Sequence, residues 1–214
     1  MCNVYSFSGF AKVLIKNKIT FSFRDFLNDQ KVDELIQTLV DKTCYEGTYE
    51  GAGIARSCFI DNCGECAIKV DKDFYVDYSD ENARSDYDDM LYWEDRRDEW
   101  IDGAWVVDSL NVVTHDAKYI ACDQNIQEID IYNRLMRINS HLLGYMPRLY
   151  ATSTNKAVEV LELCGYCHDE AYCIDKDRFN TICSFFDDTH DGNFGINSRG
   201  ELVILDVGFG IEME

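Results

Sequence analysis

The stretch DDTHDGNFGINSRGELVILDVGFG, residues 187–210, concentrates side chains that bind divalent metal ions. Mg²⁺ takes hard oxygen ligands, and only one or two of them come from protein side chains, because water and phosphate oxygens fill the other positions. Asn193 and Asp206 offer such oxygens, and a hairpin with its turn at 197–200 would bring them together. The stretch therefore predicts a magnesium site of the kind that neutralises phosphate charge during phosphoryl transfer.

Two other interpretations of this stretch are open. Asp187, Thr189, Asp191 and Gly192 match the opening of an EF-hand calcium loop, which needs a bidentate glutamate at its twelfth position. The twelfth residue is Ser198, and the sequence after it favours a strand rather than a helix. A solvated acidic turn that binds no metal is the other alternative.

Two cysteine pairs have the spacing of zinc ligands. They are Cys63 with Cys66 and Cys164 with Cys167, and they lie about 100 residues apart, well outside the usual spacing of a zinc finger. A shared zinc site is one interpretation, and ordinary buried or turn cysteines are the other. Ten cysteines without a signal peptide favour reduced thiols over disulfides.

A lysine and a glutamate lie where the sequence predicts burial. Lys69 lies inside the apolar run CAIKV, and strand alternation points it to the same side as Ala67. Glu128 shares a helix face with three apolar residues, Ile131, Tyr132 and Leu135. A buried carboxylate needs a cationic partner or it protonates, so Lys69 and Glu128 are predicted to form an ion pair between a sheet and a helix. Alternatively, either side chain reaches the surface.

The elements that would position these residues follow from the hydrophobic pattern. Residues 4–15 and 18–26 alternate, as strands do, and 29–42 have helical spacing. Residues 48–60 and 65–71 predict an antiparallel pair that begins a sheet. The later predictions are a helix over 123–144, capped by Asp123 and stopped by Gly144, strands over 146–154 and 156–164, a helix over 175–186, and a final hairpin.

Composition excludes several classes of function. The chain has 214 residues, 46% of them hydrophobic, enough to bury the core of one domain with two lobes or the cores of two small domains. A formal net charge of -20 disfavours direct binding of nucleic acid or anionic membranes. No apolar run is long enough for a membrane span and no signal peptide precedes the chain, so we expect a cytoplasmic protein.

The order of these features resembles the protein-kinase-like phosphotransferase superfamily, over roughly residues 45–210. The form D-x-H-x-x-N at 188–193 is similar to that of small-molecule kinases and of minimal, atypical kinase-like proteins encoded by bacteriophages. For a viral protein, the location would be the host cytoplasm. The resemblance implies ATP and Mg²⁺ as cofactors and a protein or small-molecule hydroxyl as the phosphate acceptor.

The fold that the resemblance implies is α+β, with the two lobes of a protein kinase. We expect an N-terminal appendage over 1–44 and an N-lobe over 45–163, with an antiparallel sheet, one inward-facing helix and an acidic insertion at 71–123. A reduced C-lobe over 164–214 would carry the catalytic loop and the metal-binding aspartate.

The same resemblance implies which residues contact the nucleotide. Gly51 and Gly53 correspond to a glycine-rich turn that lets backbone N–H groups approach phosphates, with Phe59 as a capping aromatic residue. Glu162 and Cys164, in the segment LELC, correspond to the hinge strand whose backbone would bind adenine.

It also implies the catalytic residues. Lys69 would contact the α- and β-phosphates and be held in place by Glu128. Asp188 would accept or orient the proton of the attacking hydroxyl, and Asn193 and Asp206 would share the metal. Because all five positions are present, we expect catalytic competence.

The chain departs from the family pattern in several places. Phe186 and Asp187 replace the usual His-Arg, His190 replaces a lysine, and Arg56 stands at the third glycine. Only six residues follow Gly208, so we expect no activation segment and no peptide docking platform. The N-terminal appendage, the acidic insertion or a partner would then hold the acceptor.

Two alternative functions are open on the same sequence. The chain could be a noncatalytic interaction protein whose acidic surface, above all the insertion, binds and inhibits a basic host or partner protein as a nucleic-acid mimic. It could also transfer AMP rather than the γ-phosphate of ATP onto a protein side chain.

Overall fold

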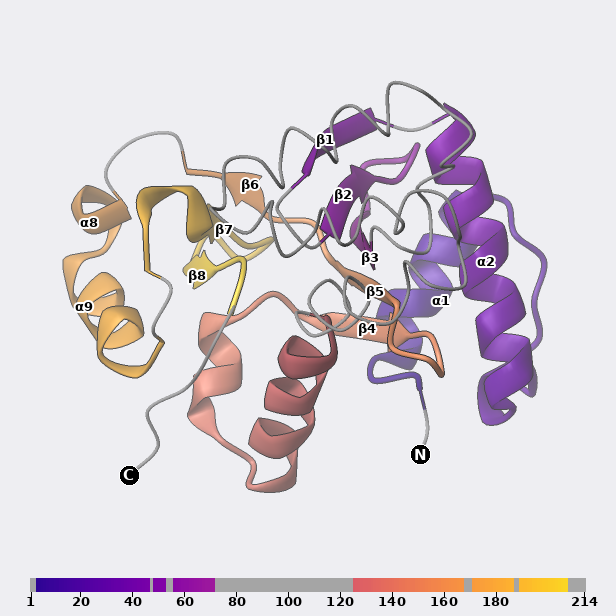
Figure 1. Cartoon of the computed structure of the whole chain (residues 1–214), viewed down its shortest axis with the longest axis horizontal. Helices are drawn as coiled ribbons and strands as arrows, with labels where there is room; N and C mark the ends of the chain where they lie inside the picture. The colour runs from indigo at the N-terminus through magenta and orange to yellow at the C-terminus, as the bar shows by residue number, and fades with distance from the viewer. Residues whose placement is uncertain are drawn as a thin grey trace, which may run out of the picture.

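A five-stranded antiparallel sheet, in the order β1-β2-β3-β5-β4, forms the centre of the fold (Figure 1). The computed structural model of the chain describes residues 3–46, 48–52, 56–71, 125–167, 171–186 and 189–207. The strands of this sheet are β1 (Thr48–Ala52), β2 (Arg56–Ile60), β3 (Cys66–Asp71), β4 (Leu149–Thr152) and β5 (Val158–Glu162). The two later strands predicted from the sequence are confirmed, and the predicted antiparallel pair is present as β2 and β3, but residues 48–60 form two strands, β1 and β2, rather than one.

A buried aspartate shapes the turn between β2 and β3. The Asp61 carboxylate accepts hydrogen bonds from the backbone N–H groups of Glu65 (2.6 Å) and Cys66 (2.7 Å). It also accepts one from Nδ2 of Asn17 (2.6 Å), at the end of the first helix. Gly64 has a φ of 64°, a left-handed conformation that glycine adopts without steric cost. The turn is thus fixed to the N-terminal helices as well as to the sheet.

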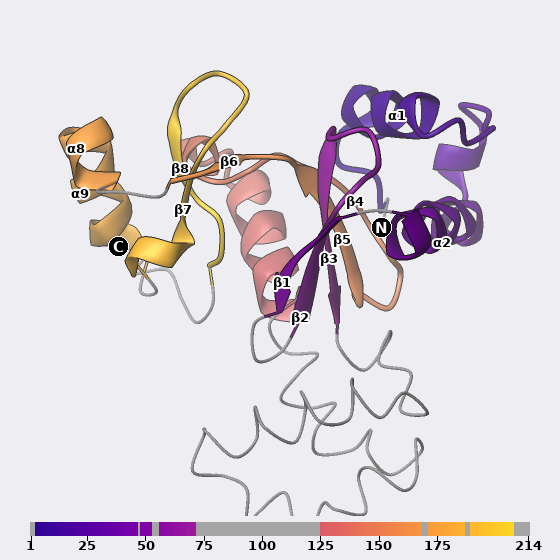
Figure 2. The same cartoon turned by 90° about the horizontal axis from the view of Figure 1, so that it is seen from above.

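Two helices cover one face of the sheet, as Figure 2 shows. They are α1 (Phe7–Lys16) and α2 (Asp29–Glu46), joined through a short 3₁₀ helix, η1 (Asp25–Leu27). Buried residues of α1 and α2 share one hydrophobic core with Ile68 of β3 and Val160 of β5. The N-terminal 44 residues therefore pack directly on the sheet.

The strand pattern predicted for 4–15 and 18–26 is wrong. Residues 7–16 form α1, because Phe10, Val13 and Leu14 have helical spacing and all face the core. The Ser6 hydroxyl caps this helix by accepting a hydrogen bond from the Gly9 N–H (3.3 Å). Alternating aromatic residues in the second segment instead surround Phe26 of η1, which is fully buried.

A further helix over 125–137 lies on the opposite face of the sheet (Figure 2). It confirms the helix predicted there, but Gly144 is not its stop. The helix gives way to a turn at 138–139, where Asn139 has a φ of 50°, and Ser140 caps a separate 3₁₀ helix, η2 (His141–Tyr145). The predicted cap, Asp123, lies outside the described residues.

The C-terminal part contains a second, three-stranded antiparallel sheet in the order β6-β7-β8. Its strands are β6 (Gly165–Tyr166), β7 (Phe194–Ile196) and β8 (Leu202–Ile204), and its helices are α8 (Ala171–Ile174), α9 (Lys176–Phe185) and the 3₁₀ helix η3 (Asp191–Asn193). Arg178 of α9 donates hydrogen bonds to the carbonyls of Leu202 and Gly144, so one side chain connects α9, β8 and η2. The predicted helix over 175–186 and the final hairpin are confirmed.

The chain is therefore a mixed α+β protein built on antiparallel sheets, as expected. Apart from Asp71, which ends β3, the acidic insertion at 71–123 lies outside the described residues. None of the helices in the described ranges combines the length and the apolar character that a membrane span requires.

The packing of α1 on the sheet gives a testable expectation. Phe10 is completely buried in the shared core, so Phe10→Ala should lower the free energy of unfolding by about 3–5 kcal/mol. Phe7, in the same helix, is 44% exposed, and Phe7→Ala serves as the matched control with a much smaller effect. Thermal unfolding followed by circular dichroism checks this, and equal midpoints for the two variants would contradict the shared core.

Candidate functional site

A buried ion pair joins the sheet to helix 125–137. Nζ of Lys69, in β3, lies 2.9 Å from Oε1 and 2.8 Å from Oε2 of Glu128. Lys69 is 8% exposed and Glu128 is 1% exposed. The ion pair predicted from the sequence is therefore present, and the alternative in which either side chain reaches the surface is wrong.

The ammonium group of Lys69 has a third acceptor. Its Nζ donates a hydrogen bond to the backbone carbonyl of Leu205, at 2.6 Å. Leu205 comes directly after β8 and directly before Asp206. All three protons of the ammonium group thus have acceptors, two on the helix and one beside the predicted metal ligand.

Lys69 lines a pocket of about 500 Å³ on the face of the five-stranded sheet opposite α1 and α2. The pocket lies between this face of the sheet and residues next to the second sheet, namely Leu163 and Cys164 before β6 and Leu205 after β8. Its lining residues are Cys58, Ile60, Ala67, Lys69, Pro147, Leu161, Glu162, Leu163, Cys164 and Leu205. Most of this surface is apolar, with one cation at one end, an arrangement that suits a ligand with a flat apolar part and an anionic part.

The hinge segment predicted to bind adenine forms one wall of this pocket. The Glu162 N–H is already used, since it donates to the carbonyl of Arg148 (2.8 Å). Its buried carboxylate accepts from the backbone N–H and the hydroxyl of Ser198 and from the N–H of Arg148. Its carbonyl accepts a hydrogen bond from the Cys164 thiol (3.8 Å), so each polar group of Glu162 already has a partner within the protein.

The backbone groups of Leu163 and Cys164 differ from those of Glu162 in their hydrogen bonding. Within the part of the chain that the structure describes, their backbone N–H and C=O groups form no backbone hydrogen bond. Polar backbone groups at the wall of an apolar pocket are suitable partners for the edge of a heterocyclic base. Burial, followed by the nearby Glu162 carboxylate, raises the pKa of the Cys164 thiol to about 12, so this side chain stays protonated at neutral pH.

The predicted metal ligands are brought close to Lys69 by backbone hydrogen bonds. The N–H of Leu205 donates to the carbonyl of Asn193, at 2.6 Å. Leu205 therefore binds Asn193 through its N–H and Lys69 through its carbonyl, and Asp206 follows it in the chain. Asn193 itself is buried, at the end of η3.

These residues have the chemistry of a magnesium site. An amide oxygen and a carboxylate are hard donors, and Mg²⁺ uses few protein ligands. No group of three or more His, Cys, Asp or Glu side chains within the described ranges is placed to hold a metal ion. Asp188 lies outside the described residues, and so does Asp187, the first residue of the EF-hand alternative.

The predicted glycine-rich turn is described only in part. Gly51 is in β1 and pairs with Cys58, next to an irregularity in the strand register, whereas Gly53 lies outside the described residues. The prediction for Phe59 is wrong. Strand alternation in β2 turns Cys58 and Ile60 toward the pocket, so Phe59 packs against the core under α1 and α2 on the other face.

The two cysteine pairs lie in different environments. Cys66 belongs to the core under α1 and α2, and Cys167 belongs to the core of the second sheet. Burial raises the pKa of Cys66 well above its ordinary value, and zinc binds thiolates rather than thiols. The surroundings of these cysteines thus favour the interpretation as ordinary buried or turn residues.

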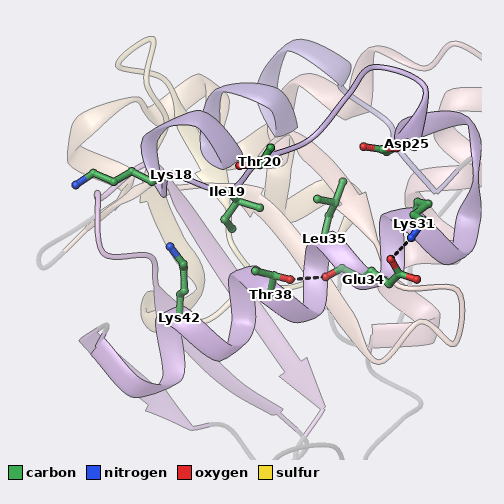
Figure 3. A pocket seen from close by; sticks show the side chains of 9 residues that line it. All are labelled: Lys18, Ile19, Thr20, Asp25, Lys31, Glu34, Leu35, Thr38 and Lys42. Atoms are coloured by element: carbon green, nitrogen blue, oxygen red, sulfur yellow. Dashed lines mark hydrogen bonds and ion pairs between the residues drawn. The ribbon is translucent and has the colours of Figure 1, made fainter.

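A second pocket, of about 400 Å³, lies between α2 and the segment 18–25 that follows α1 (Figure 3). Its charged groups largely bind one another or the backbone. Lys31 pairs with Glu34 at 2.5 Å, and the Thr38 hydroxyl donates to the carbonyl of Glu34 (Figure 3). Lys42 donates to the carbonyl of Asn17. This pocket lies in the N-terminal helices and contains none of the residues that the sequence singled out.

Comparison with known proteins adds no family assignment: no protein-family model matches the chain, and no curated protein is significantly similar to it.

The contributions of Leu205 and Ser198 could not be predicted from the sequence. Leu205 acts through its backbone N–H and carbonyl, which no side-chain pattern reveals. Ser198 binds Glu162 across a separation of 36 residues. Only the predicted hairpin at 197–200 signals that a turn would be available there.

The buried pair gives a second expectation. Lys69→Met leaves the Glu128 carboxylate buried without its cation and should cost about 3–5 kcal/mol of stability. The matched control is Lys156→Met, because Lys156 forms an exposed ion pair with Asp130 of the same helix, and such pairs contribute less than about 1 kcal/mol.

Urea unfolding of both variants checks this expectation. A double variant, Lys69→Met with Glu128→Leu, should recover much of the loss, because it removes both buried charges together. Equal losses for Lys69→Met and Lys156→Met would show that the Lys69–Glu128 pair is not desolvated.

Proposed function

We propose that this protein is a kinase-like phosphotransferase, with a two-lobed kinase-like fold, that transfers the γ-phosphate of Mg²⁺-bound ATP to a hydroxyl acceptor. The observation that carries the proposal is the position of Lys69. Its ammonium group joins Glu128 on a helix to the backbone carbonyl directly before Asp206. This arrangement supports the proposal, because it holds a cation at a mostly apolar pocket and next to the segment that carries Asp206, one of the two proposed metal ligands.

The pocket supports ATP as the bound nucleotide. Its volume of about 500 Å³ and its apolar sheet face suit an adenine ring, and the backbone of Leu163 and Cys164 would bind the edge of that ring. Lys69, at the same pocket, would then contact the α- and β-phosphates. To reach Nζ, a phosphate oxygen would share or replace the hydrogen bond to Leu205, which couples nucleotide binding to the segment before Asp206.

The catalytic roles follow from the proposed binding mode. Asn193 and Asp206 would hold Mg²⁺, which supplies charge neutralisation and orientation of the phosphates. Glu128 keeps the ammonium group of Lys69 in place, so that its positive charge is available without reorganisation. Asp188 would take the proton of the acceptor hydroxyl as the new O–P bond forms and ADP leaves.

Nucleotide binding gives the first test. ATP and Mg²⁺ together should raise the thermal midpoint of the wild-type protein by a few degrees, since a ligand at 100 times its Kd adds about 2.7 kcal/mol. Asp206→Ala should remove the part of the shift that needs Mg²⁺. Asp177→Ala, which removes an exposed aspartate of α9, is the matched control and should keep the full shift.

The absence of any shift at millimolar ATP would overturn the proposal. In that case the noncatalytic acidic interaction protein becomes the better reading, and charge neutralisation within 71–102 should then abolish binding to a basic partner. An interaction protein of that kind would be indifferent to Asp206→Ala.

Phosphate transfer gives the second test. With ATP labelled on the γ-phosphate and water as acceptor, Asp188→Ala should reduce ADP formation by about 10²–10⁴-fold, the usual contribution of a general base. The Kd for Mg²⁺-bound ATP should stay near the wild-type value. Incorporation of label from the α-phosphate into protein, without label from the γ-phosphate, would instead indicate AMP transfer.

A further inference from the structure

Gly195 occupies the middle of β7, where no room exists for a side chain. It lies opposite Val203 of β8 on one side and opposite Tyr166 of β6 on the other, so β7 is the central strand of the second sheet at this position. A Cβ atom at Gly195 would lie 2.7 Å and 3.1 Å from the two δ-carbons of Leu205, and 2.9 Å from the carbonyl oxygen of Gly165. Glycine inside a strand often marks a place where another group approaches the backbone closely. Here the Leu205 side chain and the Gly165 carbonyl are these groups.

Leu205, which fills the space beside Gly195, also forms hydrogen bonds with two residues of the candidate site. The Leu205 side chain lies over Gly195 and also lines the pocket. Its N–H binds the carbonyl of Asn193, and its carbonyl accepts from Lys69, both at 2.6 Å. A displacement of Leu205 would therefore move an acceptor of Lys69 and the start of the Asp206 segment together.

We propose that Gly195 is a positioning residue for the phosphate-binding end of the site. Its missing side chain lets Leu205 lie against β7, and Leu205 in turn sets the places of Lys69 and Asp206. An effect of Gly195 on phosphate transfer rests on the proposed function. Its effect on the hydrogen bond between Lys69 and Leu205 follows from the contacts alone.

Other glycines in the described part of the chain do not combine these features. A Cβ at Gly144 would meet nothing within 4 Å, and one at Gly165 would meet only ordinary contact at 3.9 Å. Gly9 is crowded by the Tyr150 ring, at 2.4 Å, but it lies in α1 on the other face of the sheet. Among these glycines, only Gly195 is approached closely by a residue that also binds Lys69, namely Leu205.

The test uses Gly195→Ala in the full chain, with Gly144→Ala as the matched control. The first measurement is the rate at which formaldehyde and cyanoborohydride methylate Lys69, followed by mass spectrometry. Lys69 should react several-fold faster in Gly195→Ala than in wild type, because loss of the Leu205 acceptor frees one N–H, and Gly144→Ala should leave the rate unchanged. This measurement needs no nucleotide.

The second measurement is the affinity for Mg²⁺-bound ATP. Gly195→Ala should weaken it by about 10-fold or more, since displacements of about 1 Å in a catalytic site cost up to ~10²-fold. An unchanged methylation rate in a folded Gly195→Ala protein overturns the inference. If wild type binds no nucleotide but the methylation rate still responds, the proposed function fails and the positioning role of Gly195 stands.

A double variant separates the two close contacts of Gly195. Leu205→Ala removes the δ-carbons but leaves the clash with the carbonyl of Gly165. Gly195→Ala with Leu205→Ala should therefore return the Lys69 methylation rate toward the wild-type value, and it provides the folded protein for measurement if Gly195→Ala alone does not fold. If the double variant does not fold, or if its Lys69 methylation rate stays as high as in Gly195→Ala, then Gly195 is needed for the pairing of β6 with β7 rather than for the position of Leu205. Either result would overturn the inference.

Discussion

The buried ion pair between Lys69 and Glu128 is the constraint on which the rest of the arrangement depends. Removing two opposite charges from water costs several kcal/mol for each ion, and this cost is offset only where the geometry is fixed and the remaining protons find acceptors. The sheet fixes Lys69, helix 125–137 fixes Glu128, and Leu205 supplies the third acceptor. The pair therefore requires the sheet, the helix and the start of the Asp206 segment to be in place at once.

This requirement explains how two separate sheets form one site. The five-stranded sheet supplies Lys69 and much of the pocket, whereas the second sheet supplies β7, which begins directly after Asn193, and β8, which ends directly before Leu205. Leu205 is the residue at which they meet, through one hydrogen bond in each direction. A residue without a reactive side chain can thus determine where reactive side chains lie.

The sequence predicted the parts of the fold that depend on local patterns and on isolated chemical anomalies. The strands of the sheet, the helix with an inward Glu128 and the final hairpin followed from periodicity, and the ion pair followed from two charged residues in apolar surroundings. The strand pattern at 4–15 failed, because Phe10, Val13 and Leu14 follow the i, i+3, i+4 spacing of a helix face, and packing on the sheet buries that face. The orientation of Phe59 and the bonds of Leu205 depend on long-range packing and backbone groups, which a single sequence does not encode locally.

The excess of acidic residues has two physical roles in this chain. Most acids contribute net charge, but Asp61, Glu128 and Glu162 are buried, and each accepts at least one hydrogen bond from a residue distant in the sequence. Asp61 fixes the turn into β3, Glu128 fixes Lys69, and Glu162 fixes the end of β5 to the β7–β8 turn. Glu128 and Ser198 hold the side chains of Lys69 and Glu162 at the pocket wall before any ligand enters, and groups that need no further ordering leave more of a ligand's binding energy for affinity.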